Sequence, residues 1–298
     1  MSSMARIGLV TVLYRSDEVL PGFFRSISLQ DHTDYILYLI DNSESPESDR
    51  VIRDCAERYP LTALRHVRSG GNIGVAAGNN LGIDAALTDG CTHVLLLNND
   101  IEFDQPDAFR SLLKADAAGE ALSVPKILYH DSRRIWMAGG RMDHRRALGV
   151  HEGYGKPDGP EWNKPHRISY APTCFMLVRR EVFDRIGRMD ERYFAYYDDT
   201  DFVFRALDAG FTLYYEPRVV VLHKVSSSAG ENSPFYVYYS NRNKLYFIRK
   251  HYRGFRKIVA IAYLLVSRIG FWLGFDRNRR KKLREGIRDG FRMPIQRS

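Results

Sequence analysis

The first hundred residues alternate between segments typical of strands and segments typical of helices. Four apolar, β-branched runs are typical of buried strands: residues 7–14, 35–42, 64–69 and 93–100. Three segments between them have apolar side chains at helical spacing: residues 19–30, 45–59 and 76–88. Strands that alternate with helices form parallel βαβ units, and strands that are apolar on both faces need helices on both sides of the sheet. We therefore expect an α/β nucleotide-binding half.

Polar side chains gather where these expected strands end. Tyr14 follows the first run, Asp41 ends the second, and Asn99 and Asp100 follow the apolar part of the fourth. In open α/β sheets, ligands bind outside the carboxyl ends of the strands. These side chains are therefore expected to face one common site.

Asp100 is a candidate ligand for a divalent cation. Such an ion bridges the diphosphate oxygens of a nucleotide sugar, and phosphate and water can complete its shell around one or two carboxylates. An Asp that caps the next turn or helix explains the same residue. His223, at the end of the apolar run VVVLH, is either a structural histidine or a second ligand, because imidazole together with carboxylate and phosphate oxygens suits Mn²⁺.

Asp41 and the glycine-rich stretch at residues 70–83 each have two interpretations. A carboxylate at a strand end can accept the N3–H of uracil or thymine, but Asp-Asn-Ser is also a turn sequence. The stretch GGNIGVAAGNNLGI holds five glycines and three asparagines. Its glycines would let the backbone approach phosphate or ribose, or would let a helix pack tightly on the sheet.

Three carboxylates stand at the start of an expected helix over residues 198–210: Asp198, Asp199 and Asp201. The helix dipole stabilises each anion there by roughly 0.3–1 kcal/mol, which accounts for one or two capping residues. Adjacent like charges repel one another, so that a third carboxylate indicates a cation, a basic partner or a proton-transfer task. A base that accepts a proton from a sugar hydroxyl would be such a task.

Cysteine usage and charge constrain the surroundings of the protein. The three cysteines (Cys55, Cys91 and Cys174) are far apart and odd in number, which fits a reducing, cytoplasmic compartment rather than a disulfide framework or a zinc site. The formal charge of +8 is uneven, because residues 242–298 hold 17 Lys and Arg against 3 Asp and Glu. The two parts of the chain are expected to meet different partners.

The C-terminal segment contains an apolar run, residues 258–275, between basic stretches. Eighteen residues interrupted by Ser267, Arg268 and two glycines are marginal for crossing a bilayer core of about 30 Å. The pattern favours helices that lie on the anionic cytoplasmic leaflet. The alternatives are a helix that crosses the membrane and a helix that packs on the domain. No nucleic-acid-binding motif accompanies the charge, so nucleic acid is not an expected partner.

Several motifs of the chain, in their order and spacing, resemble those of a known protein family. The motifs are VTVLY, IDNSE, NIGVAAGNNLG, LLLNND, TCFMLVRREVFDRIGRMDERYF, DDTDFVFR, AGFTLYYEP and LHKVSSS, within residues 6–252. Together they resemble family-2 glycosyltransferases with the GT-A fold, especially the bacterial rhamnosyltransferase-like branch. YYSNRNKLYFIRKHY resembles the segment that this branch carries after its catalytic domain.

The resemblance implies the fold class and the domain organisation. It implies an α/β protein of the GT-A type, with a Rossmann-like nucleotide-binding half, a mixed central sheet, and basic and apolar C-terminal helices. The catalytic domain would span residues 1–240, with a nucleotide-binding half to about 120 and an acceptor-binding half after it. Residues 241–298 would form the membrane-associating extension.

The resemblance also implies an activity. The implied activity is the inverting, metal-dependent transfer of a sugar to a glycan or polyprenyl-diphosphate-linked acceptor in cell-surface polysaccharide synthesis. The sugar expected first is L-rhamnose, with dTDP-rhamnose as the donor. A UDP-hexose or UDP-galactofuranose donor is the first alternative, and a non-catalytic nucleotide-sugar-binding or assembly protein is the second. The expected location is the cytoplasmic face of the inner membrane, and a homo-oligomer is left open.

The donor and its metal ion can be assigned to positions that match the family's motifs. Asp100 and His223 would bind Mn²⁺ or Mg²⁺ on the diphosphate. The usual two-carboxylate D-x-D is Asn98-Asn99-Asp100 here, so that metal binding would depend more on His223. The donor-binding residues would be Thr11, Tyr14 and Asp41 at the base and ribose, and Asn72, Asn80 and Asn99 along the pocket.

The acidic helix would carry the catalytic step. Asp199 would be the general base, with Asp198 as its catalytic neighbour and Asp201 in support of the site or the acceptor. The usual Glu of the family's Glu-Asp pair is Asp198 here, one methylene shorter, which leaves open which of the two reaches the acceptor hydroxyl.

Overall fold

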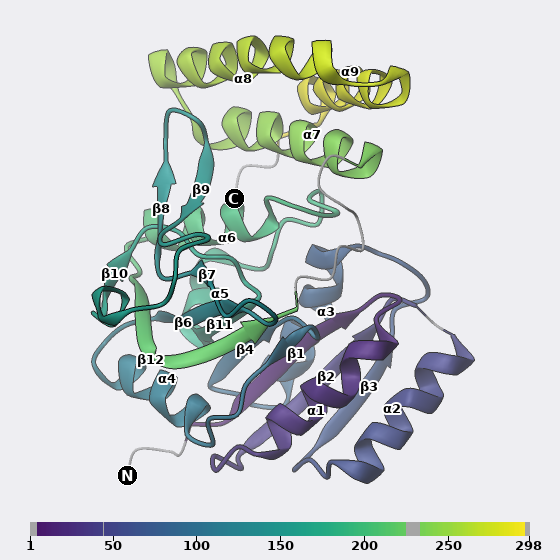
Figure 1. The fold of residues 1–298 in the computed structure, drawn as a ribbon, viewed down its shortest axis with the longest axis vertical. Coiled ribbons are helices and arrows are strands. Elements are labelled where there is room, and N and C mark those ends of the chain that lie inside the picture. Colours follow the sequence, from purple (N-terminus) through teal and green to yellow (C-terminus); the bar gives the residue numbers. More distant parts are fainter. Residues whose placement is uncertain (1–4, 44, 225–232, 296–298) are drawn as a thin grey trace.

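A mixed central sheet organises the protein (Figure 1). The computed structural model describes residues 5–43, 45–224 and 233–295; residues 225–228 of the LHKVSSS motif lie outside them. Within that part of the chain, ten strands form one sheet in the order β10-β12-β6-β11-β4-β1-β2-β3, with β5 beside β12 and β7 beside β6. The strands are β1 (Ile7–Leu13), β2 (Tyr35–Asp41), β3 (Leu64–Arg68), β4 (His93–Leu97), β5 (Ile101–Glu102), β6 (Leu122–Tyr129), β7 (Ile135–Met137), β10 (His166–Ile168), β11 (Phe175–Arg179) and β12 (Leu213–His223).

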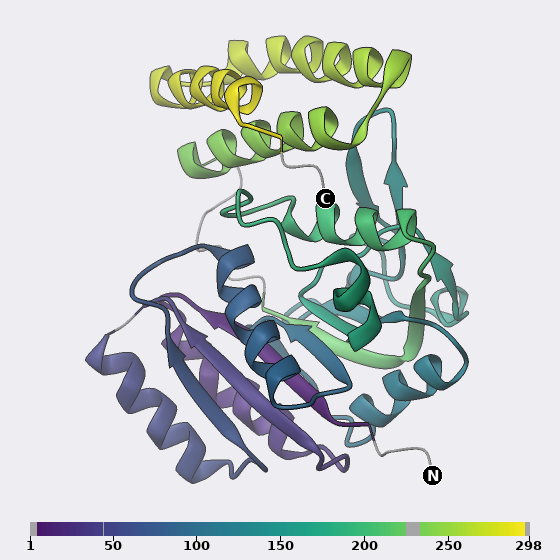
Figure 2. The same ribbon diagram turned by 180° about the vertical axis from the view of Figure 1, so that it is seen from behind.

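The N-terminal half is the expected parallel α/β unit. Strands β4, β1, β2 and β3 are parallel neighbours. Helices α1 (Leu20–Ser28) and α2 (Pro46–Arg58) cover one face, and α3 (Val75–Thr88) covers the other (Figures 1 and 2). Every residue of β2 and β4 is buried, because both faces of these strands are covered.

Close packing of α3 on β1 explains two glycines of the glycine-rich stretch. A Cβ added at Gly78 would lie 2.9 Å from the Val12 side chain, and one at Gly82 would lie 2.4 Å from that of Val10. Both distances are too short for a larger residue. The packing interpretation of this stretch therefore holds for its helical part.

The second half adds antiparallel strands. β11 pairs antiparallel with both β4 and β6, and β12 runs parallel to β6. Pro217 lies within a single strand, β12, whose register shifts between Glu216 and Val220. Such a bulge accommodates a residue that lacks a backbone N–H. Helices α4 (Ala108–Ala117), α5 (Arg180–Ile186) and α6 (Asp198–Asp208), together with a hairpin of β8 (Gly140–Asp143) and β9 (Leu148–His151), complete this half.

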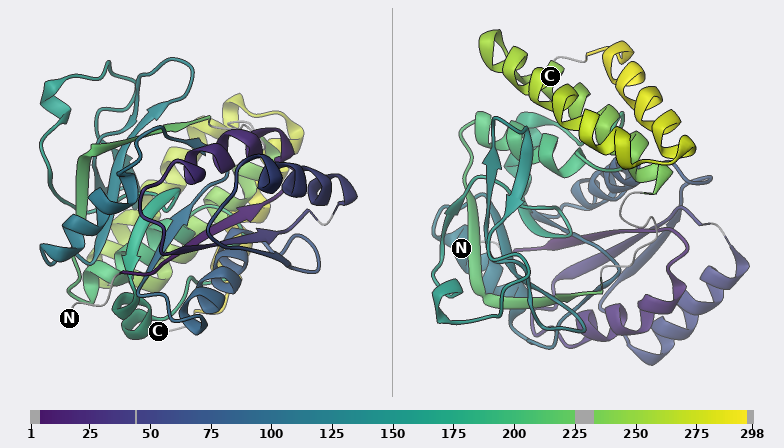
Figure 3. Two further views of the ribbon diagram at one scale, coloured as in Figure 1. Left: turned by 90° about the horizontal axis from the view of Figure 1, so that it is seen from below. Right: turned by 45° about the horizontal axis from the view of Figure 1, so that its top comes forward.

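Three C-terminal helices form a separate layer. α7 (Pro234–His251) lies against the rest of the protein, and α8 (Gly254–Gly274) and α9 (Arg277–Arg292) lie on its outer side (Figure 3). The predicted boundary at residue 240 falls inside α7. α7 contributes Leu245, Tyr246 and Ile248 to an apolar cluster that also includes Met142 of the hairpin.

α8 presents apolar side chains outward. Among the described residues it is the one helix long and apolar enough to cross a membrane by length and composition, with 21 residues and a mean hydropathy of 1.5. Only 11% of its apolar window is buried. Phe255, Ile258 and Leu273 are 78%, 65% and 74% exposed.

Candidate active site

Asp100 and His223 meet at the carboxyl end of the sheet. Pairing of β5 with β12 sets His223 opposite Ile101, and the Lys224 N–H donates to the Asp100 carbonyl at 2.9 Å. This register brings His223 Nε2 to 3.2 Å from Asp100 Oδ1. Both side chains are 8% exposed. Residues 123 positions apart in the chain thus lie side by side at one corner of the site.

This corner fits a divalent cation. An oxygen and an imidazole nitrogen 3.2 Å apart match adjacent ligands on one ion, since bonds of about 2.1 Å at right angles separate two ligands by about 3 Å. Oxygen together with imidazole suits Mn²⁺. His223 Nδ1 is buried without a hydrogen-bond partner among the described residues. The Asn99 amide donates to the Ser16 hydroxyl, which ties the turn that carries Asp100 to the segment after β1.

Thr11 and Asp41 form a buried floor beside that corner. Both side chains are fully buried, on neighbouring strands β1 and β2. Asp41 Oδ1 accepts the Ser43 N–H at 2.7 Å, and Asp41 Oδ2 lies 3.5 Å from His66 Nε2. Thr11 Oγ1 has no hydrogen-bond partner among the described residues. Tyr14, at the rim, is 40% exposed.

Asp41 also belongs to a second group of potential metal ligands. Asp41, Asp49 and His66 each offer one atom, and these atoms lie within 4.8 Å of one another. Asp49 is already paired with Arg68, and Asp41 accepts the turn N–H of Ser43. Asp100 and His223 are the pair that the sequence predicted for the metal ion.

The two asparagines of the glycine-rich stretch have different surroundings. Asn72 is exposed and accepts the Gly74 N–H at 3.1 Å. Asn80 is buried; its Oδ1 accepts the Met189 N–H at 3.0 Å, and its Nδ2 donates to the Met189 carbonyl at 3.0 Å. Asn80 therefore positions the segment that leads to the acidic helix, and its contact with a donor stays a prediction.

The acidic helix α6 begins after a strained turn. Tyr196 and Tyr197 have φ angles of 65° and 70°, a region that costs non-glycine residues about 1–3 kcal/mol. The Asn243 amide of α7 donates to the carbonyls of Ala195 and Tyr196 at 2.7 and 2.9 Å. A side chain of the C-terminal layer thus fixes the turn that aims α6 into the site.

Asp199 is held in place by two hydroxyl groups. Its Oδ2 accepts the Tyr170 hydroxyl at 3.0 Å, and its Oδ1 accepts the Thr200 hydroxyl at 3.1 Å and the Thr200 N–H at 2.6 Å. Burial raises the pKa of Asp199, although these hydrogen bonds oppose the rise. Burial and the adjacent charge of Asp199 raise the pKa of Asp198 to about 8. Raised pKa values are suited to a group that accepts a proton at neutral pH.

Asp201 has a different environment from its two neighbours. It is fully buried and forms ion pairs with Arg205 at 2.7 Å, Lys250 at 2.8 Å and His251 at 2.7 Å. Burial alone would raise its pKa, but the hydrogen bond from His251 and the positive charges of Arg205 and Lys250 lower it well below the usual range. Asp201 therefore stays ionised and joins α6 to α7; its predicted support of the site or the acceptor stays a prediction.

An aromatic wall of Trp136, His151 and Tyr170, which the sequence did not predict, connects the corner of Asp100 and His223 to Asp199. Trp136 packs against His223 with ring centroids 4.7 Å apart and against His151 at 4.4 Å, and His151 stacks on Tyr170 at 5.8 Å. Burial lowers the pKa of His151 to about 4, so that its ring is neutral. The three aromatic residues come from β7, β9 and the loop before β11, and no local spacing links them.

Asp100 and Asp199 belong to one site. Asp100 contacts His223 at one end of the aromatic wall, and Asp199 accepts the Tyr170 hydroxyl at its other end. The site therefore combines a potential cation corner, a buried carboxylate floor and a second carboxylate with a raised pKa. Such an arrangement can hold a diphosphate at one end and take a proton from a hydroxyl group at the other.

Known proteins share this fold. GalNAc-T7, solved with UDP, GalNAc and Mn²⁺, superimposes with a TM-score of 0.69 at 15% identity, over 97% of this chain and 55% of its own. The mannosyltransferase PcManGT from Pyrobaculum calidifontis, solved with GDP-Man and Mn²⁺, gives a TM-score of 0.58 at 14% identity, over 96% of this chain and 86% of its own. At these identities the likeness shows the fold, which is the predicted GT-A type.

Relatives of known sequence include two rhamnosyltransferases. The N-acetylglucosaminyl-diphospho-decaprenol L-rhamnosyltransferase of Mycobacterium tuberculosis is 25% identical over 93% of this chain and 96% of its own. The dTDP-rhamnosyl transferase RfbF of Shigella flexneri is 23% identical over 61% of this chain and 62% of its own. The low-salt glycan biosynthesis hexosyltransferase Agl10 of Haloferax volcanii is 26% identical over 67% of this chain; the chain spans 61% of that relative.

These relatives confirm the predicted resemblance to the rhamnosyltransferase-like branch. The family model described as glycosyl transferase family 2 matches residues 9–187, more than half of the chain. The matched range includes Asp41, Asp100 and Tyr170, and it ends before Asp199 and His223. The protein is a glycosyltransferase and a member of glycosyl transferase family 2.

Proposed function

We propose that the protein transfers L-rhamnose from dTDP-rhamnose, with inversion of configuration, to a hydroxyl group of a polyprenyl-diphosphate-linked glycan. The carrying observation is that Asp199 has a raised pKa, is oriented by Tyr170 and Thr200, and shares a site with Asp100. The choice of rhamnose and of a lipid-linked acceptor is supported by the names of the two rhamnosyltransferase relatives.

The chain's own residues account for the chemistry as follows. Asp199 accepts the proton of the acceptor hydroxyl, and the acceptor oxygen attacks the anomeric carbon on the face opposite the nucleotide. A base and a leaving group on opposite faces of the sugar lead to inversion without a covalent enzyme intermediate. A divalent cation bound by Asp100 and His223 would stabilise the negative charge on the departing diphosphate.

The donor pocket follows from the buried floor. Asp41 Oδ2 accepts the N3–H of thymine, and Thr11 Oγ1 is a buried hydroxyl in need of a partner. Tyr14 offers an exposed ring to the ribose or base, and Asn72 and Asn99 lie along the diphosphate. A UDP-linked hexose or galactofuranose would use the same floor, because uracil presents the same N3–H.

The membrane is proposed as the place where acceptor and enzyme meet. The outward apolar residues of α8 and the excess of Lys and Arg in residues 242–298 suit the anionic cytoplasmic leaflet, where each basic residue contributes on the order of 1 kcal/mol. Flotation with vesicles of phosphatidylcholine, with and without phosphatidylglycerol, tests this part. A protein that stays at the bottom of the gradient with both vesicle types would refute it.

Thermal-shift titration tests the donor. A ligand that binds only the folded state raises Tm, and dTDP-rhamnose with Mn²⁺ should raise Tm more than UDP-glucose, UDP-galactose or UDP-galactofuranose. Single-turnover assays then test catalysis, since a non-catalytic binding protein would release no nucleotide diphosphate. A rise confined to a UDP-sugar would replace the donor assignment.

A further inference from the structure

Lys244 stands out among the buried cations of the protein. Within the described residues, four Lys and Arg side chains are buried. Three of them pair with carboxylates at 2.7 or 2.8 Å: Lys126 with Asp158, Arg205 with Asp201, and Lys250 with Asp190 and Asp201. The side chain of Lys244, a residue that is 6% exposed, has no ion pair and no hydrogen bond with a described residue. Its ammonium group is not fully enclosed, so that water or an anionic ligand can reach it.

The surroundings of Lys244 are themselves cationic. After burial, the charges of Arg268 on α8 and Arg146 in the β8–β9 turn contribute most to the lowering of its pKa, to about 8. The Arg268 guanidinium donates to the Asn241 side chain, and within the described structure it has no ion pair with a carboxylate. The charge of the Asp143 carboxylate opposes this effect and raises the pKa of Lys244. The Asp143 Oδ1 atom, however, already accepts the backbone N–H groups of Arg145 and Arg146 at 3.0 Å each.

This arrangement is unfavourable without an anion. Burying a charge is costly unless the charge is paired, and like charges nearby add to that cost. Lys244, Arg268 and Arg146 come from three separate elements, so that the fold rather than a local sequence brings them together. Arginine and lysine side chains are the groups that bind phosphate oxygens.

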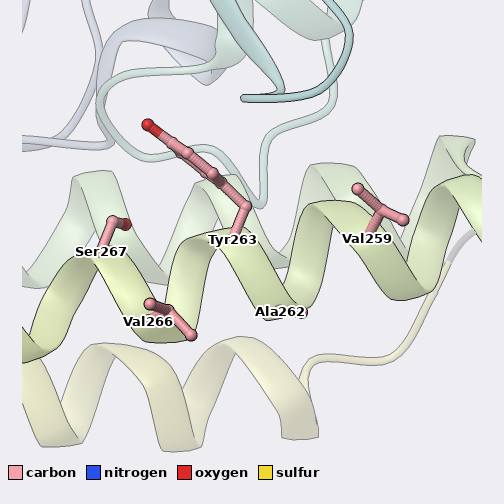
Figure 4. Close-up of a pocket in the computed structure, with 5 residues that line it drawn as sticks. All are labelled: Val259, Ala262, Tyr263, Val266 and Ser267. Carbon is pink, nitrogen blue, oxygen red and sulfur yellow. The ribbon is translucent and has the colours of Figure 1, made fainter.

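A hydroxyl group and an apolar groove adjoin these cations. Burial lowers the pKa of Arg268, and its Nη1 donates to the Ser267 hydroxyl at 3.5 Å. Ser267 also lines a groove of about 440 Å³ on one face of α8 (Figure 4). The groove is lined by Val259, Ala262, Tyr263, Val266 and Ser267. A ligand with an anionic head and an apolar tail suits this combination.

The anion cluster also adjoins the catalytic carboxylates. Tyr197 immediately precedes α6, and the side-chain amide of Asn243, the neighbour of Lys244 on α7, donates to the Tyr196 carbonyl at 2.9 Å. The Tyr197 hydroxyl donates to the Ala147 carbonyl of the β8–β9 turn at 2.9 Å. One molecule could therefore have its anionic group at the cluster and its sugar hydroxyl at Asp199.

We propose that Lys244, Arg268 and Arg146 bind the diphosphate of a polyprenyl-diphosphate-linked acceptor, with the prenyl chain along the α8 groove. The inference rests on the proposed function, and it adds the site that selects a lipid diphosphate over a neutral glycan. Lys244 is the central residue of this site.

Binding of farnesyl diphosphate, measured by calorimetry in the absence of donor, tests the site. Lys244→Met should weaken the affinity at least tenfold. Lys281→Met, which removes one charge from an α9 side chain that is 66% exposed, should leave the affinity within twofold. Equal affinities of both variants and the wild type would refute the assignment, as would absence of farnesyl diphosphate binding to the wild type.

Two competitors distinguish the sources of the anion. Displacement of farnesyl diphosphate by dTDP would place it in the donor pocket and overturn the proposal. Binding to phosphatidylglycerol-containing vesicles that depends on Lys244, without saturable binding of farnesyl diphosphate, would assign the cluster to bulk lipid headgroups and overturn it as well.

Stability provides a readout that is independent of ligand. Because Lys244→Met removes an unpaired buried charge, the Tm of this variant without ligand should equal or exceed that of the wild type; a clear decrease would show a structural role and refute the inference. Donor binding is measured separately. If Mn²⁺-dependent donor binding fails while the Lys244-dependent binding of farnesyl diphosphate holds, the proposed function falls and the anion site stands.

Discussion

Replacing Asp201 by asparagine tests whether the C-terminal layer holds the catalytic helix. The fully buried carboxylate pairs with Arg205, Lys250 and His251. Removing one partner of a buried ion pair costs about 3–5 kcal/mol. Arg205 keeps two backbone carbonyls at 2.7 Å, and Lys250 keeps Asp190 at 2.8 Å, so that we expect a loss near 3 kcal/mol.

Thermal and urea unfolding at neutral pH measure this loss. A cost of 3 kcal/mol corresponds to a decrease in Tm of roughly 6–12 °C, at about 2–4 °C per kcal/mol for a domain of 150–250 residues. Asp208→Asn is the matched control, because it removes an exposed carboxylate from the end of the same helix. If Asp201→Asn and Asp208→Asn differ by less than about 1 kcal/mol, the network does not stabilise the fold and the reasoning fails.

The lowered pKa of Asp201 predicts how the stability loss of Asp201→Asn changes with pH. The pKa of Asp201 in the folded protein lies below its ordinary value of 3.8. A carboxylate with a lowered pKa stabilises the fold above its unfolded pKa, and this contribution is lost as the pH falls through the folded pKa. The difference in stability between wild type and Asp201→Asn should therefore be full at neutral pH and shrink below about pH 4.

Three further substitutions address the chemistry. Asp199→Asn should keep donor affinity within about twofold in calorimetry while kcat falls by about 10²–10⁴, the usual contribution of a general base; unchanged kcat would reject this base. Asp100→Ala should weaken donor binding with Mn²⁺ at least tenfold and have little effect with EDTA, and an equal loss under both conditions would argue against a metal ligand. Asp198→Asn removes a carboxyl group whose raised pKa of about 8 keeps it protonated at acidic pH, so that the acidic limb of kcat/KM against pH should stay in place; complete loss of turnover would instead make Asp198 the base.

Local patterns were sufficient to predict the parallel half of the sheet and the carboxylates at the ends of its strands. The apolar runs, their polar ends and the acidic helix start are each contained in a few consecutive residues. Asp100 and His223 were predicted as partners through the family resemblance, and the pairing of β5 with β12 brings them to 3.2 Å. Gly78 and Gly82 could be interpreted in two ways until their contacts with β1 were known.

Long-range contacts account for what the sequence did not reveal. Trp136, His151 and Tyr170 form a wall because three separate segments converge on it, and their spacing in the chain has no period. The same holds for Lys244, whose lack of a partner depends on which carboxylates the fold places elsewhere. Net charge indicates a basic C-terminal part, but it cannot distinguish a paired lysine such as Lys250 from an unpaired one.

The C-terminal layer is therefore tied to the chemistry of this enzyme and is more than an attached membrane anchor. Asn243 fixes the strained turn before α6, and Lys250 holds both Asp190 and Asp201. These contacts come from the inner side of α7, while α8, on its outer side, exposes apolar residues. A shift of α7 caused by an apolar ligand or a bilayer at α8 would reach the turn that aims Asp199. The position of Asp199 and the proposed binding of a lipid-linked acceptor thus depend on the same helix.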